Sequence, residues 1–414
     1  MPFNLPCKRT HSRFAYTREV SRAVIVTSLI AVLVIAASRV AQAQQATRSS
    51  DAPSDLNLWF VRVAFSPSRV IAATDFRSGG DAASNVTIEL GRQTDGTSAW
   101  HRVYNYPSFG VGFYSGRFEH RKELGEPFAA YGFFSWPFPV AARAQVTSDV
   151  DIGVSWHWNE FDPQTNPTNT ALGSDAAYYI GAAASLRFVL DAHSSVYGGA
   201  RFMHWSNGGT KQPNLGLATI GPYVGVRYNF APQVVRPRPR PEEWPPFAPY
   251  WEFVVGAGGS QKNITARTNS SLDAVDRRRD FRAFNITAAL QRGFYRFGKA
   301  AVGADLTYDG GTGARVDIVD HRQVESRVAV GDRFALGLYG GYEHVIARFS
   351  ILAQLGYQPW RGFDDEDYPP FYQRYGSRFY VTRHLWGTFA VRTVKGRRAN
   401  FVEFGAGYSY RTGT

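Results

Sequence analysis

The sequence predicts an all-β protein that crosses a membrane as an antiparallel β-barrel, built either as two eight-stranded halves or as one barrel of about sixteen strands. Three observations support this fold class. Segments of about ten residues in which apolar and polar residues alternate recur along the chain, separated by turn residues. After residue 43, no apolar run reaches the roughly 20 residues that a membrane-spanning helix needs. The chain is rich in tyrosine (22) and tryptophan (10), which form aromatic girdles at both membrane interfaces of such barrels.

The N-terminus has the organisation of a secretory signal peptide, which we assign to residues 1–43. Basic residues precede an apolar run from Ala23 to Ala37, and an Ala-x-Ala site ends at Ala43. We expect cleavage after Ala43, with residues 44–56 as a flexible start of the mature chain; an uncleaved anchor is the alternative. The only cysteine, Cys7, lies inside this signal, so the mature chain forms neither disulfides nor cysteine-bound metal sites.

Strand patterns are clear in residues 57–231, where we expect about eight strands. In the segment 145–158, valine, isoleucine and tryptophan occupy most even positions, and mainly polar residues occupy the odd ones. Segments 176–190 and 217–230 repeat this pattern. One apolar and one polar face on each strand indicate a barrel with lipid outside and a polar interior.

The connections between these strands alternate in length. Short ones are expected at 137–139 and 191–194, and long ones at 116–126, 159–173 and 207–214. Outer-membrane barrels have short periplasmic turns and long outer loops. The long connections are therefore expected on the outer side of the membrane.

A segment rich in proline and arginine, residues 232–249, divides the chain. Alternating Arg and Pro favour an extended conformation and cannot occupy a central strand, so this segment is expected to be a linker on the periplasmic side. The second half, residues 250–414, again contains about eight strand patterns. The linker favours two barrels over a single barrel of about sixteen strands.

His204 and Ser206 are the candidate catalytic residues. On the expected strand 197–207 they share one face, opposite Arg201, because side chains at i and i+2 lie on the same side of a strand. That face points outward, toward lipid, at the outer rim. A histidine beside a serine can take the hydroxyl proton so that the serine attacks an acyl ester. The Asn207 amide and a backbone N–H of the following glycine turn are placed in sequence to stabilise the oxyanion. A pair without catalytic function is the alternative.

The motif around this pair resembles that of the outer-membrane lipid A 3-O-deacylases. The matching positions are His204-Trp205-Ser206-Asn207, Gly209, Lys211-Gln212-Pro213-Asn214 and Gly216. Segments 106–113 and 161–167 are similar to the longer members, the acyloxyacyl hydrolases. The resemblance covers residues 57–231 and implies an eight-stranded barrel that hydrolyses an acyl ester of lipopolysaccharide. It implies Ser206 as nucleophile, His204 as base, and Asn207 and Gly209 as the oxyanion hole.

One position departs from the family pattern, in which a glutamate orients the histidine. The matching residue here is Ala218, which cannot hold an imidazole tautomer. Glu160 has outward parity at the same rim and is a candidate replacement. A whole strand, residues 176–190, separates it from His204, and at about 4.8 Å per strand a direct contact is not expected.

Charge suggests the partners. Arg117, Arg121 and Lys122 lie in an expected outer loop and Lys211 lies beside the motif; they could bind lipid A phosphates, and an ordinary solvated loop is the alternative. The net charge is +12, of which +7 remains without residues 1–43. An exported basic protein is expected to meet anionic lipid or polysaccharide rather than nucleic acid.

These observations predict an outer-membrane esterase that acts on lipid A and needs neither a cofactor nor a metal ion. A non-catalytic outer-membrane barrel, porin-like or structural, is the alternative from another class.

Overall fold

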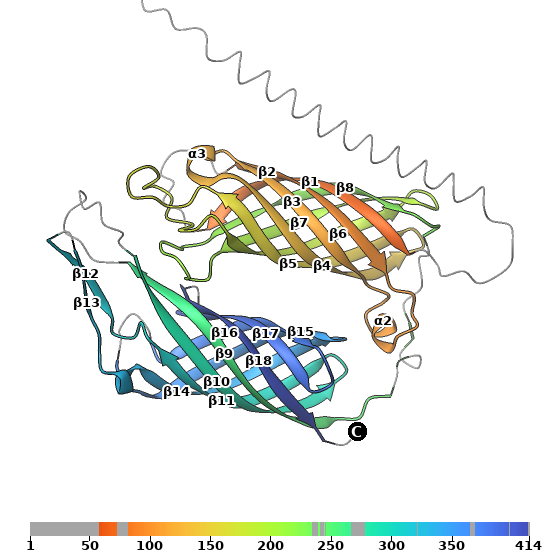
Figure 1. Cartoon of the computed structure of the whole chain (residues 1–414). Coiled ribbons are helices and arrows are strands. Elements are labelled where there is room, and N and C mark those ends of the chain that lie inside the picture. The colour runs from red at the N-terminus through yellow and green to blue at the C-terminus, as the bar shows by residue number, and fades with distance from the viewer. Residues whose placement is uncertain are drawn as a thin grey trace, which may run out of the picture.

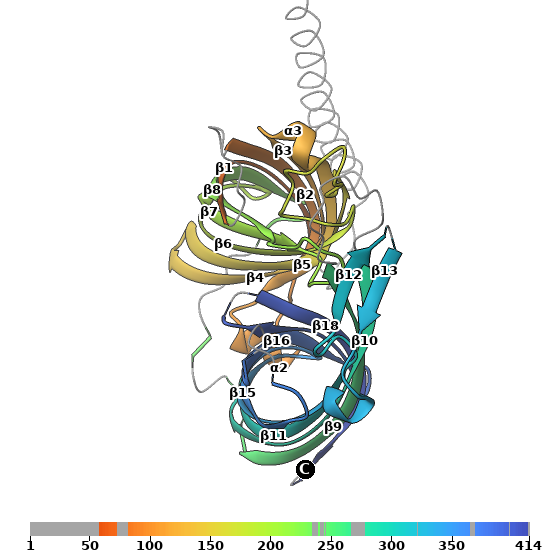
Figure 2. The ribbon, with the colours of Figure 1, turned by 90° about the vertical axis from the view of Figure 1, so that its left-hand side faces the viewer.

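The computed structural model describes residues 58–72, 82–233, 239–240, 244, 246–265, 278–320, 322–364, 369–396 and 398–412. It contains two closed antiparallel barrels of eight strands each, which lie side by side (Figures 1 and 2). The prediction of β-barrels is confirmed, and the two-barrel alternative holds. The expected signal peptide and the segment 44–56 lie outside the described residues. No helix among those residues is long and apolar enough to cross a membrane.

The first barrel runs through β1 (Trp59–Ala72), β2 (Ala82–Gln93), β3 (Ser108–Phe118), β4 (Gly125–Ala141), β5 (Ala144–Trp158), β6 (Ala177–Val189), β7 (Ser194–Ser206) and β8 (Leu217–Asn229). Each strand pairs with the next one in sequence, and β1 pairs with β8 to close the sheet. Two short helices, α2 (Ala99–Val103) and α3 (Arg121–Leu124), lie at opposite ends of this barrel (Figure 1). We call the end with α2, where β1 begins, the inner end, and the end with α3 the outer end.

The prediction of a short connection at residues 137–139 is wrong. Pro137 and Pro139 lie inside β4, and the tight turn falls two residues later, between Ala141 and Ala144. The register shifts just after Pro139, at an irregularity of the kind that lets a sheet accept proline, which has no N–H to donate. The turn expected at 191–194 falls one residue earlier, at 190–193, because Ser194 already belongs to β7.

The second barrel runs through β9 (Tyr250–Thr265), β10 (Arg278–Tyr295), β11 (Gly298–Asp309), β14 (Phe334–Ile346), β15 (Phe349–Arg361), β16 (Phe371–Tyr380), β17 (Leu385–Val394) and β18 (Arg398–Arg411). It closes by pairing β9 with β18. Between β11 and β14, the chain forms a ribbon of β12 (Arg315–Val319) and β13 (Arg322–Ser326), followed by the 3-10 helix η2 (Val330–Arg333). The ribbon projects beyond the outer end of the barrel (Figure 1).

Buried ion pairs fill the first barrel. Glu89 accepts hydrogen bonds from Arg62 and from Tyr131, the latter at 2.8 Å, and its carboxylate lies 3.3 Å from Arg201. Arg62 also pairs with Asp149 at 2.8 Å. All these side chains are buried, because strand alternation places them inside. An eight-stranded barrel is just wide enough for side chains to fill it, and this network does so.

Removal of one partner from this network is expected to destabilise the first barrel strongly. Glu89→Ala leaves two buried guanidinium groups without their shared carboxylate, which we expect to cost about 3–5 kcal/mol. The measurement is the temperature above which the protein, solubilised in detergent, no longer migrates on a gel as a compact folded barrel. We call this migration the compact gel mobility. Glu119→Ala, at an exposed site after β3, is the control. Equal transition temperatures for the two variants would contradict the claim that Glu89 stabilises the first barrel through this network.

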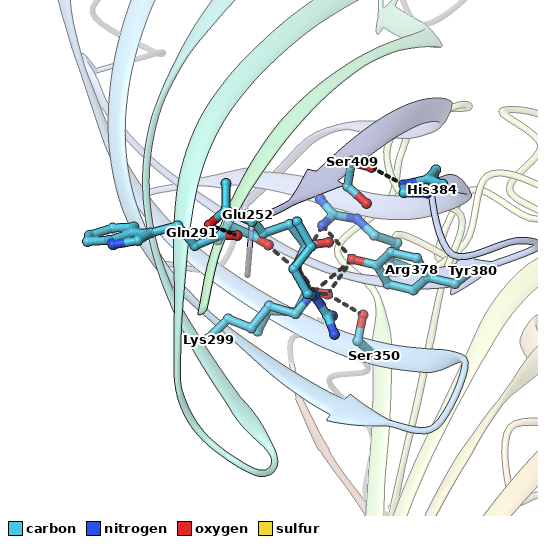
Figure 3. A network of polar contacts seen from close by, with 12 residues as sticks. Glu252, Gln291, Lys299, Ser350, Arg378, Tyr380, His384 and Ser409 are labelled. Atoms are coloured by element: carbon cyan, nitrogen blue, oxygen red, sulfur yellow. Dashed lines mark hydrogen bonds and ion pairs between the residues drawn. The ribbon is translucent and has the colours of Figure 1, made fainter. Parts of the chain in front are cut away.

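The second barrel is filled in the same way near its inner end (Figure 3). Lys299 Nζ lies 2.7 Å from the Glu252 carboxylate and 3.3 Å from that of Glu343. Arg378 donates to Glu343 at 2.8 Å, and Ser350 Oγ donates to it at 2.8 Å. Charged side chains therefore occupy both interiors, whereas apolar side chains such as Val302 (64% exposed) cover the outward faces.

The two barrels touch at their inner ends through Tyr104, in the connection between β2 and β3. Its hydroxyl donates to the Val345 carbonyl and lies 3.2 Å from His344 Nε2. The ring packs 5.0 Å from Phe297 and 4.9 Å from Trp136, centroid to centroid. Burial raises the pKa of the Tyr104 phenol, which therefore stays protonated as a donor.

Candidate active site at the outer rim

The candidate residues lie at the outer end of β7, which a cluster of inward-facing aromatic rings holds in place. Trp205, between His204 and Ser206, is completely buried inside the first barrel. Its ring centroid lies 5.5–6.0 Å from four other rings, those of Tyr114, Phe118, Trp158 and Tyr179. Tight aromatic packing at this end of the interior fixes the strand from which the candidate pair projects.

His204 and Ser206 face outward and are half-buried. Each is paired across the sheet with an outward residue of β6, His204 with Ile180 and Ser206 with Tyr178. The Ser206 hydroxyl accepts hydrogen bonds from Asn214 Nδ2 at 2.9 Å and from the Gly208 backbone N–H at 3.1 Å. The candidate nucleophile thus lies beside a backbone donor and the Asn214 amide, a contact that the sequence did not predict.

The imidazole of His204 has close neighbours, but no acidic partner within the part of the chain that the structure describes. Ala218 is its partner on β8, so the position of the family's glutamate lies directly beside it. Gly216 leaves room for the ring: at φ +77°, an added Cβ would lie 2.9 Å from His204 Cε1. Among the described residues, none forms a hydrogen bond with the imidazole. Glu160 instead pairs with Lys211 Nζ at 2.5 Å.

Asn207 and Gly209 form a compact turn after β7. Asn207 Oδ1 accepts the Gly209 N–H at 2.9 Å, while its Nδ2 donates to the Lys211 carbonyl at 2.7 Å and to Ser174 Oγ at 3.0 Å. The two candidate oxyanion donors are therefore bonded to each other here. The Gly208 N–H, already directed at Ser206 Oγ, is the backbone donor nearest to the candidate nucleophile.

The outer loops are joined through Asn169, a fully buried residue that sequence reasoning missed. Its Nδ2 donates to the Glu123 carbonyl of α3 at 3.1 Å, and its Oδ1 accepts the Ala171 N–H at 3.1 Å. The same loop bonds to the β7–β8 loop, where the Gly216 N–H donates to the Ala171 carbonyl at 3.1 Å. Helix α3 and the candidate site are therefore connected along one rim. In the sequence, Asn169 is one of several polar residues in a long loop, and nothing there distinguishes it as buried.

The four basic candidates are spread along this rim. Arg117 lies at the end of β3 and faces outward, and Arg121 and Lys122 are exposed on α3. Arg121 pairs with Glu126 at 3.0 Å. The structure thus brings Lys211 together with Glu160, and places the other three at β3 and α3, away from the His204 strand in the sheet order.

Two family models match this chain. Residues 86–227 match the model described as lipid A 3-O-deacylase (PagL), and residues 249–412 match the model described as acyloxyacyl hydrolase, C-terminal domain. Together they cover most of the chain, one match for each barrel. The first barrel belongs to the lipid A 3-O-deacylase family. The second barrel, which the sequence motif left unassigned, is matched as the C-terminal domain of acyloxyacyl hydrolases.

Comparison with solved structures finds other barrels at low similarity. The outer membrane enzyme PagL is 20% identical over 40% of this chain and 97% of its own, with a TM-score of 0.28. Neisserial surface protein A is 10% identical over 42% of this chain and 99% of its own, with a TM-score of 0.31. The CymD monoaromatic hydrocarbon channel is 10% identical over 87% of this chain and 89% of its own, with a TM-score of 0.20. No curated protein matches.

Family and fold together make this protein a Gram-negative outer-membrane barrel of the lipid A hydrolase class.

Proposed function

We propose that this protein is an outer-membrane esterase that hydrolyses an acyl ester of lipid A with Ser206 as nucleophile and His204 as base. The observation that supports the proposal most is that this pair faces outward at one end of the first barrel, beside the Gly208 N–H. A lipid ester in the outer leaflet reaches such a site from the membrane, without entering the filled interior of the barrel.

The reaction follows from this arrangement. His204 takes the Ser206 proton as Oγ bonds to the ester carbonyl carbon, and the carbonyl oxygen becomes an oxyanion. The Gly208 N–H stabilises this charge, as do Asn207 and Gly209 once they release each other. The intermediate expels the sugar alkoxide, which receives the proton from His204. Water then attacks the acyl-enzyme with His204 again as base, which releases the fatty acid and restores the Ser206 hydroxyl.

Substrate recognition is assigned to the basic residues of the rim. Lys211, beside the motif, and Arg117, Arg121 and Lys122 along α3 and β3 present positive charge where lipid A carries phosphates. Anionic lipopolysaccharide is thus the proposed partner, without nucleic acid, cofactor or metal ion. The filled interiors of both barrels argue against the porin-like alternative, because they leave little room for a wide channel.

We propose the following domain organisation: a cleaved signal (residues 1–43), a flexible start (44–56), the deacylase barrel (57–231), a linker (232–249) and the second barrel (250–414). The expected N-terminus of the protein isolated from outer membranes is Gln44, which intact-mass measurement checks. A mass that retains residues 1–43 would support the uncleaved anchor instead.

The function is tested by expression in a Gram-negative host that lacks endogenous lipid A deacylases. We expect the mass spectrum of its lipid A to show species that lack one hydroxyacyl chain, compared with cells that carry the empty vector. Identical lipid A from both cultures, with the protein present in the outer membrane, would contradict the proposal.

A further inference from the structure

The second barrel contacts the candidate oxyanion turn directly, at the outer ends of both barrels. The Asn263 backbone N–H on β9 donates to the Gly209 carbonyl at 3.2 Å. Its side-chain Oδ1 accepts the Gln212 N–H at 3.2 Å, so one buried residue bonds to both sides of the turn. Asn263 Nδ2 donates to Asp280 at 2.6 Å, which fixes the orientation of the amide.

Val402 on β18 provides the apolar part of this contact. The other large outward-facing residues of β18, Phe404, Tyr408 and Tyr410, are 45–55% exposed, whereas Val402 is 1% exposed. The first barrel covers it: a Cβ added at Gly208 would lie 1.8 Å from Val402 Cγ2. Gly208 also has φ +68°, so both the backbone conformation and the close approach require glycine.

Aromatic side chains extend the same contact toward the candidate nucleophile. Tyr178, the cross-strand neighbour of Ser206, packs its ring 4.9 Å from that of Phe389 and 6.3 Å from that of Phe404. Phe389 and Phe404 face outward from β17 and β18 of the second barrel. The second barrel therefore touches the strand and the turn on either side of Ser206.

From these contacts we infer that the second barrel positions the catalytic turn, with Asn263 and Val402 as positioning residues that act through Gly208 and Gly209. The inference rests on the proposed function. A donor stabilises an oxyanion only when its N–H points at the developing charge. The turn contains two glycines with positive φ, Gly208 and Gly209, which have no side chains of their own to pack against the first barrel. Contact with a rigid sheet supplies the missing restraint.

The test combines Asn263→Ala with Val402→Ala in the full chain. These changes remove the bond to the Gln212 N–H and the side chain that covers Gly208, while the strands of the second barrel remain. We expect kcat for acyl release from lipopolysaccharide to fall about 10–100-fold, because misplaced catalytic groups lower the rate by such factors. KM should stay within about twofold of the wild-type value. Val302→Ala, on the exposed outward face of β11, is the matched control and should change neither constant.

Amide hydrogen exchange of the peptide that covers residues 205–212 gives a readout that does not require activity. We expect exchange there to be at least about tenfold faster in the double variant than in the wild type and in Val302→Ala. Unchanged exchange would overturn the inference, and so would faster exchange with an unchanged kcat. A wild type that exchanges slowly but releases no fatty acid would instead contradict the proposed function. The comparison of exchange rates between the wild type and the double variant would then decide whether the second barrel holds the turn. Compact gel mobility confirms that each variant is folded.

Discussion

Ser206→Ala is expected to lower the rate of fatty-acid release from lipopolysaccharide by at least about 10³-fold, because loss of a serine nucleophile removes the covalent step. His204→Ala should cause a loss of similar size, and the double variant should be no slower than either single one, since the two residues act as a unit. The measurement is the initial rate of release by purified protein in mixed micelles. Ser148→Ala, at an exposed outward serine on β5, is the control and should retain full activity. Wild-type rates in Ser206→Ala would remove Ser206 from the mechanism.

The same position also tests the orientation of the barrel in the membrane. The only cysteine of the sequence, Cys7, lies in the expected signal peptide, so Ser206→Cys gives residues 44–414 their only thiol. Intact cells that carry this variant should react with a membrane-impermeant maleimide, because the outer end of β7 is expected to face the outside. Labelling only after the outer membrane is opened would place the rim on the periplasmic side and contradict the assignment.

Ala218→Glu is expected to raise kcat by about 10- to 10³-fold. Ala218 lies directly opposite His204 on the neighbouring strand, and cross-strand pairs have Cβ atoms about 4.5–5.5 Å apart, within reach of a glutamate carboxylate. A carboxylate there would hold the imidazole in the tautomer that accepts the serine proton. Loss of such an orienting acid lowers kcat by about 10⁴ in a serine protease.

Ala218→Gln separates the effect of the charge from that of the added volume. Ala218 is buried, so both substitutions require similar rearrangement, but only the glutamate stabilises an imidazolium. We expect the glutamine variant to be no faster than the wild type. The glutamate variant could fold, as its compact gel mobility would show, and still be no faster than the glutamine variant. This result would show that the orientation of His204 does not limit the reaction.

The fold was largely predictable because the strand pattern is local. Alternation with a period of two marks each strand and its outward face, which is how the direction of His204 and Ser206 follows from residues 197–207. The prediction of a turn at residues 137–139 was wrong. It relied on prolines as markers of turns, whereas Pro137 and Pro139 lie in β4 and pair with β5. The ribbon of β12 and β13 was also missed, because it lies in a loop outside the barrel.

The candidate site was only partly predictable because its contacts come from segments far apart in the sequence. The position of Glu160 just after the strand 145–158 indicated the rim at which it lies, but the alternation of that strand breaks at His157, and Trp158 faces inward. The partner of Glu160, Lys211, lies 51 positions away, and the pair depends on how two loops fold. Asn263 and Val402 belong to another barrel, and nothing in their strand patterns distinguishes them from neighbouring residues. The burial of Val402 on an outward face is visible only in three dimensions.

The most direct test of the central claim is the initial rate of hydroxy fatty acid release from purified lipopolysaccharide by three proteins compared side by side. Placing the reaction at His204 and Ser206 predicts that Ala218→Glu is fastest, the wild type is slower, and Ser206→Ala releases nothing above the background without enzyme. A wild type that releases no more fatty acid than Ser206→Ala, with all three proteins folded, would contradict the claim.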